Sequence, residues 1–474
     1  MPVERYWTPF REHQSLILLL AAFFLPSRER QHPVLLPAEG DSLVGAANDE
    51  DVGIFCIFAC MKEKLLGMTL QELKAAAQGC GLKPFVGAQL ADWLYAKRAT
   101  SWDRMVNISK AAREALAEKY DLGVSAPVGS AISSDGTKKY LFEVHPERKS
   151  PAPSTNCNQQ NYNQIDKITD NCSVKEVASV TNLKEDSVVV DNSKNTGLDE
   201  EGKNTGKNWV DNGERGDGQG VEYIESVMIP EEERRTLCVS SQAGCRMGCK
   251  FCMTGRHGFH GQLDAAEILN QFLSIDEAGE LSNAVFMGMG EPMDNYDAVS
   301  RALEVLTAPW GFAWSPKRVT VSTIGVVPVL KRFLEEERCH LAVSLHNPFP
   351  EERLSLMPAQ KAWDIREIID LIRQYDFSGQ RRVSFEYTMF AGFNDDKRHA
   401  DALIRLLRGL ECRVNLIRFH RIPDFPYDCA SDAVMEAFRD RLNNHQILCT
   451  IRSSRGEDIL AACGMLAGQH AASD

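Results

Sequence analysis

The stretch TLCVSSQAGCRMGCKFC, residues 236–252, opens the most regular part of the chain. It begins with a short apolar run typical of a buried strand and then enters a glycine-containing loop. This loop holds Cys245, Cys249 and Cys252 in a C-x3-C-x2-C pattern. Three thiolates at this spacing can ligate three irons of a [4Fe–4S] cluster and leave the fourth iron open. A zinc site is the alternative, but it would need a fourth ligand from elsewhere because no second cysteine pair follows.

From this stretch onward, β-rich apolar runs alternate with amphipathic helical patterns. The expected strands are 236–240, 283–288, 318–323, 340–345, 382–390, 412–419 and 447–452, and the expected helices are 263–275, 296–308, 325–336, 363–375, 396–409 and 431–444. Strands that alternate with helices of this length predict a parallel sheet with crossover helices. About six such units over residues 233–453 predict an α/β partial (βα)6 barrel, a relative of the eight-unit TIM barrel. Chemistry in such folds lies at the carboxyl ends of the strands.

Two segments precede the predicted barrel. Residues 65–125 predict a small helical accessory domain, in which Thr69 and Glu72 form a capping box at the start of the first helix. Residues 1–64 read as a leader or extension. Their apolar run, 15–26, is too short to span a bilayer, and no small-residue cleavage site follows it.

A long polar segment interrupts the chain between the helical domain and the barrel. Residues 146–220 are rich in Asn, with eleven between 151 and 220 and no Phe in that range, and they predict a disordered insertion. The flanking segments, 134–145 and 221–232, predict the two strands of one hairpin. The free-energy cost of closing a loop rises only slowly with its length, so a hairpin can tolerate such an insertion.

The formal net charge of −13 at first argues against a nucleic-acid partner. However, residues 1–64 hold nine acidic and six basic side chains, and residues 151–220 hold twelve and seven. The rest of the chain is therefore only mildly acidic. The overall charge does not exclude a basic groove on the catalytic part.

Four sequence elements together resemble a known enzyme family. The cysteine loop after the first barrel strand, followed by GMGEP at 288–292, resembles the radical S-adenosylmethionine superfamily. LCVSSQAGC at 237–245 and RGEDILAACGMLA in the tail, 454–474, add Cys238 and Cys463. These match the dual-specificity RNA methyltransferases that methylate carbon 2 of adenosine. The similarity runs from about Leu65 to Gly468, apart from the insertion.

The resemblance implies a reaction that carries the methyl group on the protein. Carbon 2 of adenine is electrophilic and cannot attack a methyl sulfonium, so Cys463 first takes the methyl group from one S-adenosylmethionine. A second S-adenosylmethionine, cleaved at the cluster, activates that methyl group, which adds to the adenine and gives a transient protein–RNA adduct. Glu225, thirteen residues before Cys238, corresponds to the base that removes the ring proton. Cys238 then attacks the Cys463 sulfur, which releases the RNA and leaves a disulfide.

The resemblance also implies the contacts of S-adenosylmethionine. They fall at the ends of the second, third, fourth and sixth barrel strands: Gly290, Glu291, Ser322, Ser344, Leu345, His346 and His420. His420 departs from the family, which commonly has Asn at this position. A histidine can still donate a hydrogen bond, although its protonation state becomes a variable.

The implied partners are 23S rRNA, tRNA as a second substrate, and an electron donor for the cluster. We expect a cytoplasmic monomer without a membrane partner. The plausible phosphate contacts are Lys138, Lys139, Tyr140, Arg246, Lys250, Arg256 and His257, each of which reads equally well as a solvated charge or polar group. The remaining nine cysteines read as free thiols of a reducing compartment: Cys56, Cys60, Cys80, Cys157, Cys172, Cys339, Cys412, Cys429 and Cys449.

Two other functions remain open. A related enzyme that methylates carbon 8 of adenosine shares the cluster and both relay cysteines, so these motifs barely separate the two reactions. A non-catalytic iron–sulfur protein that binds RNA is the alternative from a different class.

Overall fold

The computed structural model describes residues 62–146, 220–379 and 381–468. The predicted leader lies outside the described residues except for its last three positions, and nearly all of the predicted insertion lies outside them as well. Both therefore stay predictions. None of the helices in the described part of the chain is long and apolar enough to cross a membrane.

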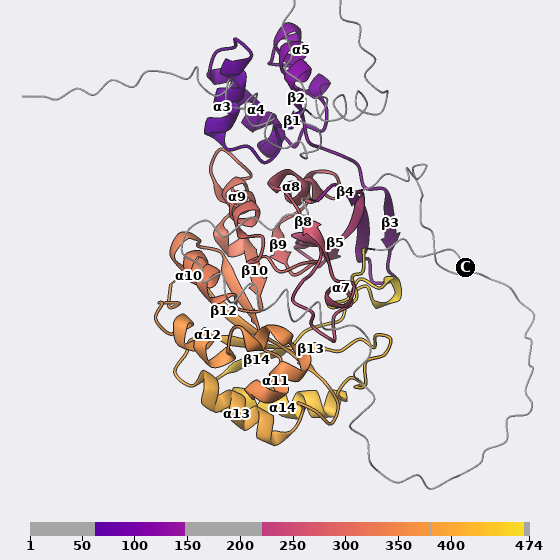
Figure 1. Cartoon of the computed structure of the whole chain (residues 1–474), viewed down its shortest axis with the longest axis vertical. Coiled ribbons are helices and arrows are strands. Elements are labelled where there is room, and N and C mark those ends of the chain that lie inside the picture. Colours follow the sequence, from indigo (N-terminus) through magenta and orange to yellow (C-terminus); the bar gives the residue numbers. More distant parts are fainter. Residues whose placement is uncertain (1–61, 147–219, 380, 469–474) are drawn as a thin grey trace, which may run out of the picture. The chain divides into compact units, whose positions relative to one another are not determined.

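A ten-stranded sheet in the order β14-β13-β12-β11-β10-β9-β6-β5-β4-β3 forms the centre of the fold (Figure 1). Seven neighbouring strands are parallel: β6 (Arg235–Cys238), β9 (Asn283–Phe286), β10 (Val319–Thr323), β11 (His340–Ser344), β12 (Val383–Met389), β13 (Arg413–Arg418) and β14 (Leu448–Ile451). Strands β14 and β3 are the two edges, so the sheet is not closed. The predicted α/β partial barrel is confirmed.

Crossover helices connect the parallel strands: α8 (Ala265–Leu273), α9 (Tyr296–Thr307), α10 (Val327–Glu336), α11 (Pro350–Leu356), α12 (Ile365–Ile372), α13 (Lys397–Leu407) and α14 (Asp432–Asn444). Most of these helices bury an apolar face, as in α12, where Ile365, Ile368 and Ile372 are fully buried. The predicted strands and helices are all present, with ends that differ by a few residues. Hydrophobic periodicity therefore predicted the elements of the barrel.

The helical region comprises α3 (Leu70–Gly79), α4 (Phe85–Ala91) with a π-helical turn (Asp92–Ala96), and α5 (Lys110–Lys119). The predicted capping box is confirmed: the Glu72 side chain accepts from the Thr69 N–H at 2.7 Å, and the Glu72 N–H donates to Thr69 Oγ1 at 3.3 Å. Two short parallel strands, β1 (Glu63–Lys64) and β2 (Tyr120–Asp121), join the start of this region to its end.

Three antiparallel strands extend the sheet beyond β6. Strand β4 (Lys138–Val144) pairs antiparallel with β5 (Glu222–Pro230), and these strands lie in the two segments predicted to form the interrupted hairpin. Strand β3 (Gly129–Ile132) pairs with β4 and was not predicted, because its sequence, GSAI, contains no apolar run. It places Asp135 and Gly136 in a turn between β3 and β4. Strand β5 is therefore internal to the sheet.

The buried guanidinium of Arg353 on α11 holds the ends of two barrel strands together. It donates to the carbonyl oxygens of Ile324 at 3.1 Å, Ser344 at 2.9 Å and Leu345 at 3.1 Å, and to Gln360 Oε1 at 2.6 Å. These carbonyls follow β10 and end β11. Arg353 therefore fixes two loops at the carboxyl edge of the sheet.

We expect Arg353→Met to destabilise the protein by about 3 kcal/mol or more, because it leaves several buried acceptors without donors. Denaturant unfolding, followed by tryptophan fluorescence, measures the change. The control is Arg366→Met, since Arg366 is exposed and pairs with Asp364 of the same helix turn; its unfolding midpoint should match that of the wild type. Equal unfolding midpoints for the two variants would contradict the role of Arg353.

Candidate functional site

A cavity of about 160 Å³ lies at the carboxyl ends of the parallel strands. Most of the predicted site residues border it: Cys245, Cys249, Cys252, Gly290, Glu291, Ser322, Ser344, His346 and Cys463. Typical ligand pockets measure about 300–1,000 Å³. The cavity is smaller than this range, and tail residues Cys463 and Gly464 form part of its wall.

The cysteine loop is fixed by main-chain contacts. It follows β7 (Gln242–Gly244), which pairs with β8 (Phe259–Gln262), and it ends at α7 (Met253–Arg256). The Cys245 N–H donates to Gly258 at 2.7 Å, and the Lys250 N–H donates to Leu356 of α11 at 3.0 Å. The three thiols therefore approach the cavity from one loop.

The chemistry of these three thiols fits a metal cluster. Desolvation by the surrounding protein raises the pKa of all three, although each side chain keeps some exposed surface. Bound metal would draw off their protons, because thiolates are the ligating form. Among the described residues, no group of three or more His, Cys, Asp or Glu side chains is arranged to hold a single metal ion.

His346 follows β11 and is held in an uncommon conformation. Its φ is +54°, in the left-handed region, and its ring packs edge-on against Phe251 of the cysteine loop, with 4.9 Å between ring centroids. Ring Nδ1 accepts a hydrogen bond from the Thr388 N–H at 3.0 Å. Burial, with the Arg353 charge adding to it, lowers the pKa of His346 to about 3. The neutral ring therefore has Nε2–H as its remaining donor.

Glu291 and Gly290 form the turn after β9. Glu291 is buried, and its two oxygens accept from the N–H groups of Met293 at 3.1 Å and Ile324 at 2.9 Å. Burial raises its pKa to about 7. Gly290 has φ +97°, and a Cβ there would lie 2.5 Å from Gln242 Cβ. Only glycine fits this turn, which brings the main chain up to the cavity.

Glu386 on β12 also borders the cavity, and sequence reasoning missed it. The side chain is 3% exposed. Its Oε1 accepts from Ser384 Oγ at 2.9 Å and Asn415 Nδ2 at 2.8 Å, whereas Oε2 has no hydrogen-bond partner among the described residues. A buried carboxylate oxygen without a donor fits a ligand that carries hydroxyl or amino groups. S-adenosylmethionine, which the sequence resemblance implies, carries both, so the cavity wall fits it.

Cys238 and Cys463 lie near enough for the charge of one to affect the other. Cys238 ends β6 and is buried, whereas Cys463 is exposed, and both are free thiols. Burial raises the pKa of Cys238 to about 12, and the charge of Cys463 adds to that rise. The transient disulfide between them stays a prediction.

Glu225 lies on β5, an internal strand of the sheet, and is 2% exposed. Its carboxylate pairs with Lys139 on β4, and it accepts a hydrogen bond from the Ala467 N–H of the tail. Its role as a base stays a prediction.

His420 does not border the 160 Å³ cavity. It is buried after β13, with Nε2 3.1 Å from Ser454 Oγ and Nδ1 3.3 Å from Glu457 Oε1. These partners belong to the segment that leads to Cys463. Its contact with S-adenosylmethionine stays a prediction, as do the roles of Leu345 and the other contact residues.

Most of the residues expected to contact phosphate interact instead with other groups of the protein. Lys139 and Tyr140 are buried, and Arg246 pairs with Asp294 at 2.8 Å. Arg256 donates to the Pro423 carbonyl. The expected phosphate contacts of Lys139, Tyr140 and Arg246 are wrong, because these buried side chains cannot reach an RNA backbone in solvent.

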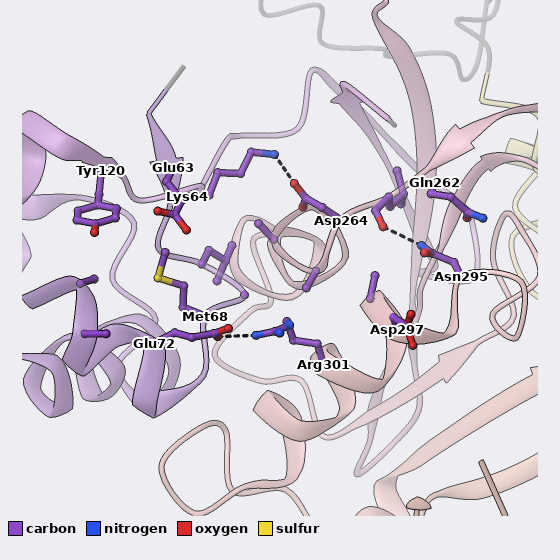
Figure 2. Close-up of a pocket in the computed structure, with 18 residues that line it drawn as sticks. Glu63, Lys64, Met68, Glu72, Tyr120, Gln262, Asp264, Asn295, Asp297 and Arg301 are labelled. Carbon is purple, nitrogen blue, oxygen red and sulfur yellow. Dashed lines mark hydrogen bonds and ion pairs between the residues drawn. The ribbon is translucent and has the colours of Figure 1, made fainter. Parts of the chain in front are cut away.

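A larger cavity, about 810 Å³, lies between the helical region and the barrel (Figure 2). Charged pairs bridge it: Lys64 Nζ lies 2.9 Å from Asp264 Oδ2, and Arg301 pairs with Glu72. It contains none of the predicted site residues. The smaller cavity is therefore the candidate site.

Comparisons with known proteins agree with this geometry. Residues 239–403 match the model of the Radical SAM superfamily, and residues 63–122 match the Ribosomal RNA large subunit methyltransferase N-terminal domain. A crystal structure of a radical SAM methyltransferase from Sphaerobacter thermophilus aligns with a TM-score of 0.67 and 32% identity, covering 86% of this chain and all of that chain.

Two curated relatives extend the match over most of both chains. A protein of Porphyromonas gingivalis, described as a probable dual-specificity RNA methyltransferase RlmN, is 50% identical over 86% of this chain and 98% of its own. The dual-specificity RNA methyltransferase RlmN of Syntrophus aciditrophicus is 31% identical over 85% of this chain and 95% of its own. The chain therefore belongs to the RlmN family of dual-specificity RNA methyltransferases, within the radical SAM superfamily.

Proposed function

We propose that this protein methylates carbon 2 of an adenosine in 23S rRNA and in tRNA, with the methyl group carried on Cys463. The observation that carries the proposal is that Cys463 and the three thiols of the cysteine loop border one cavity, with the free thiol of Cys238 close by. A methyl relay needs the thiol that carries the methyl group to lie beside the cluster site and within reach of the thiol that resolves the adduct.

The residues of this chain fit the groups that the reaction needs. Cys245, Cys249 and Cys252 would hold a [4Fe–4S] cluster, which with S-adenosylmethionine supplies the methyl group and the radical that activates it. Gly290, Glu291, Ser322, Ser344, His346 and Glu386 border the cavity that would bind S-adenosylmethionine. Glu386 Oε2 and His346 Nε2 offer an acceptor and a donor to its polar groups.

Three residues would act on the RNA and its adduct. Cys463 is the exposed thiol that can receive a methyl group and then present it to an adenine that has left its stack. Glu225 would accept the proton that leaves the ring. Cys238 would attack the Cys463 sulfur, so that the Cys463–carbon bond breaks and a disulfide forms between the two sulfurs.

The position of the methyl group tests the proposal. Reconstituted protein is incubated without oxygen with S-adenosylmethionine, a chemical reductant and 23S rRNA fragments or tRNA. We expect 5′-deoxyadenosine and S-adenosylhomocysteine together, and 2-methyladenosine in the digested RNA by mass spectrometry. Detection of 8-methyladenosine would instead support the carbon 8 reaction. If neither 2-methyladenosine nor 8-methyladenosine forms, the result would support the alternative function, an iron–sulfur protein that binds RNA.

Cys463→Ala should abolish RNA methylation by at least about 10³-fold, because no other group can carry the methyl. The cluster should persist, which its absorption spectrum and iron content measure. The matched control is Cys429→Ala, since Cys429 lies outside the cavity. Methylation by Cys463→Ala at the wild-type rate would exclude the carrier role.

Cys238→Ala should instead accumulate a covalent protein–RNA adduct, since the thiol that breaks the Cys463–carbon bond is missing. Denaturing gel electrophoresis with labelled RNA detects the adduct. Cys449→Ala provides a buried-cysteine control. If Cys238→Ala turns over without an adduct, Cys238 does not resolve it.

A further inference from the structure

One buried ion pair lies behind the C-terminal tail. Lys139 and Glu225 share a face of the sheet, because Lys139 is opposite Val227 and Glu225 is opposite Leu141 in the antiparallel register. Their side chains are 5% and 2% exposed, and Lys139 Nζ lies 2.8 Å from Glu225 Oε1.

The pair contacts the main chain of the tail on both sides of the proposed methyl carrier. Lys139 Nζ donates to the carbonyl oxygen of Leu460 at 3.5 Å. The other carboxylate oxygen, Glu225 Oε2, accepts from the N–H groups of Ala467 at 2.8 Å and Gly468 at 3.2 Å. The cation thus contacts a carbonyl and the anion contacts amides, so each charge meets a main-chain group of opposite polarity.

We propose that Lys139 is a positioning residue that, paired with Glu225, clamps the tail so that Cys463 borders the cavity. This inference rests on the roles proposed above for Glu225 and Cys463. A buried ion pair adds little net stability, because removing two charges from water offsets their attraction. Its effect here is geometric: it attaches residues 460–468, which form no strand of the sheet, at two fixed points.

The clamp also limits which lone pairs of Glu225 can act as a base. Oε1 accepts from Lys139, and Oε2 accepts from two tail amides. A carboxylate oxygen has two lone pairs, so both lone pairs of Oε2 are occupied, whereas Oε1 keeps one beside Lys139. A base must direct a lone pair at the proton that it removes. Glu225 therefore accepts a proton on Oε1 with the tail in place, or on Oε2 after Ala467 and Gly468 have left it.

Hydrogen exchange of the full-length protein, read by mass spectrometry on C-terminal peptides, tests the clamp without cofactor or RNA. In Lys139→Met we expect the amides of 460–468 to exchange at least about tenfold faster, as expected when a charge-assisted hydrogen bond is lost. Lys139→Arg keeps the charge and should restore protection. The matched control is Lys138→Met, because Lys138 lies on the opposite face and pairs with Glu277.

A second variant weakens the clamp from the tail and leaves the ion pair intact. Gly468 has φ +64°, and a Cβ there would overlap the carbonyl oxygen of Tyr223. Gly468→Ala should therefore speed exchange in the same peptides, even if Lys139→Met fails to fold. Unchanged exchange in Gly468→Ala, or in folded Lys139→Met, would overturn the clamp.

Catalytic assays separate the clamp from the proposed function. In both variants we expect more 5′-deoxyadenosine per methylated RNA than in the wild type, by at least about tenfold, since a displaced Cys463 uncouples cleavage from transfer. An unchanged ratio would show that the clamp does not position Cys463. The wild-type protein could make no methylated adenosine while both variants still show faster exchange. That result would refute the proposed function and would leave the clamp standing.

Discussion

All seven parallel strands of the barrel must end at the same edge, and the rest of the molecule depends on that constraint. Once β6 pairs in parallel with β9, each loop that follows a strand joins the same rim. Residues far apart in the sequence, such as Cys249, Ser322 and Glu386, therefore border one cavity. The antiparallel strands β5 and β4 then continue the sheet past β6 and bring Glu225 and Lys139 beside the tail.

The sequence predicted the barrel because burial imposes long, regular periods on it. A strand that is covered on both faces has an apolar run in its sequence, and a helix that covers the sheet has an amphipathic pattern. Both patterns can be recognised without knowing which residues are in contact. Other strands lack these patterns. Strand β3 (GSAI) and the β7–β8 pair (QAG and FHGQ) contain glycine and polar residues in place of an apolar run, and they were not predicted. The cysteine loop was predicted because its three cysteines lie close together in the sequence.

Charged residues of the site were predicted less well, since their roles depend on neighbours distant in the sequence. Glu386 reads as an ordinary strand residue until Asn415 on β13 is placed beside it. Lys139 reads as a surface cation, yet the register of β4 and β5 buries it against Glu225. Arg353 is a further case: it satisfies its donors with carbonyl oxygens rather than a carboxylate. Pairing across strands decides each of these environments, and residue type alone does not.

The antiparallel register of β4 and β5 has a consequence for how this protein can change over evolution. Val144 pairs with Glu222 although more than seventy residues separate them in the sequence. Buried side chains such as Leu141 and Ile224 set this register, rather than a tight turn. The connecting sequence is therefore under little geometric selection from the hairpin. It can gain, lose or replace residues while the strands that carry Lys139 and Glu225 keep their alignment.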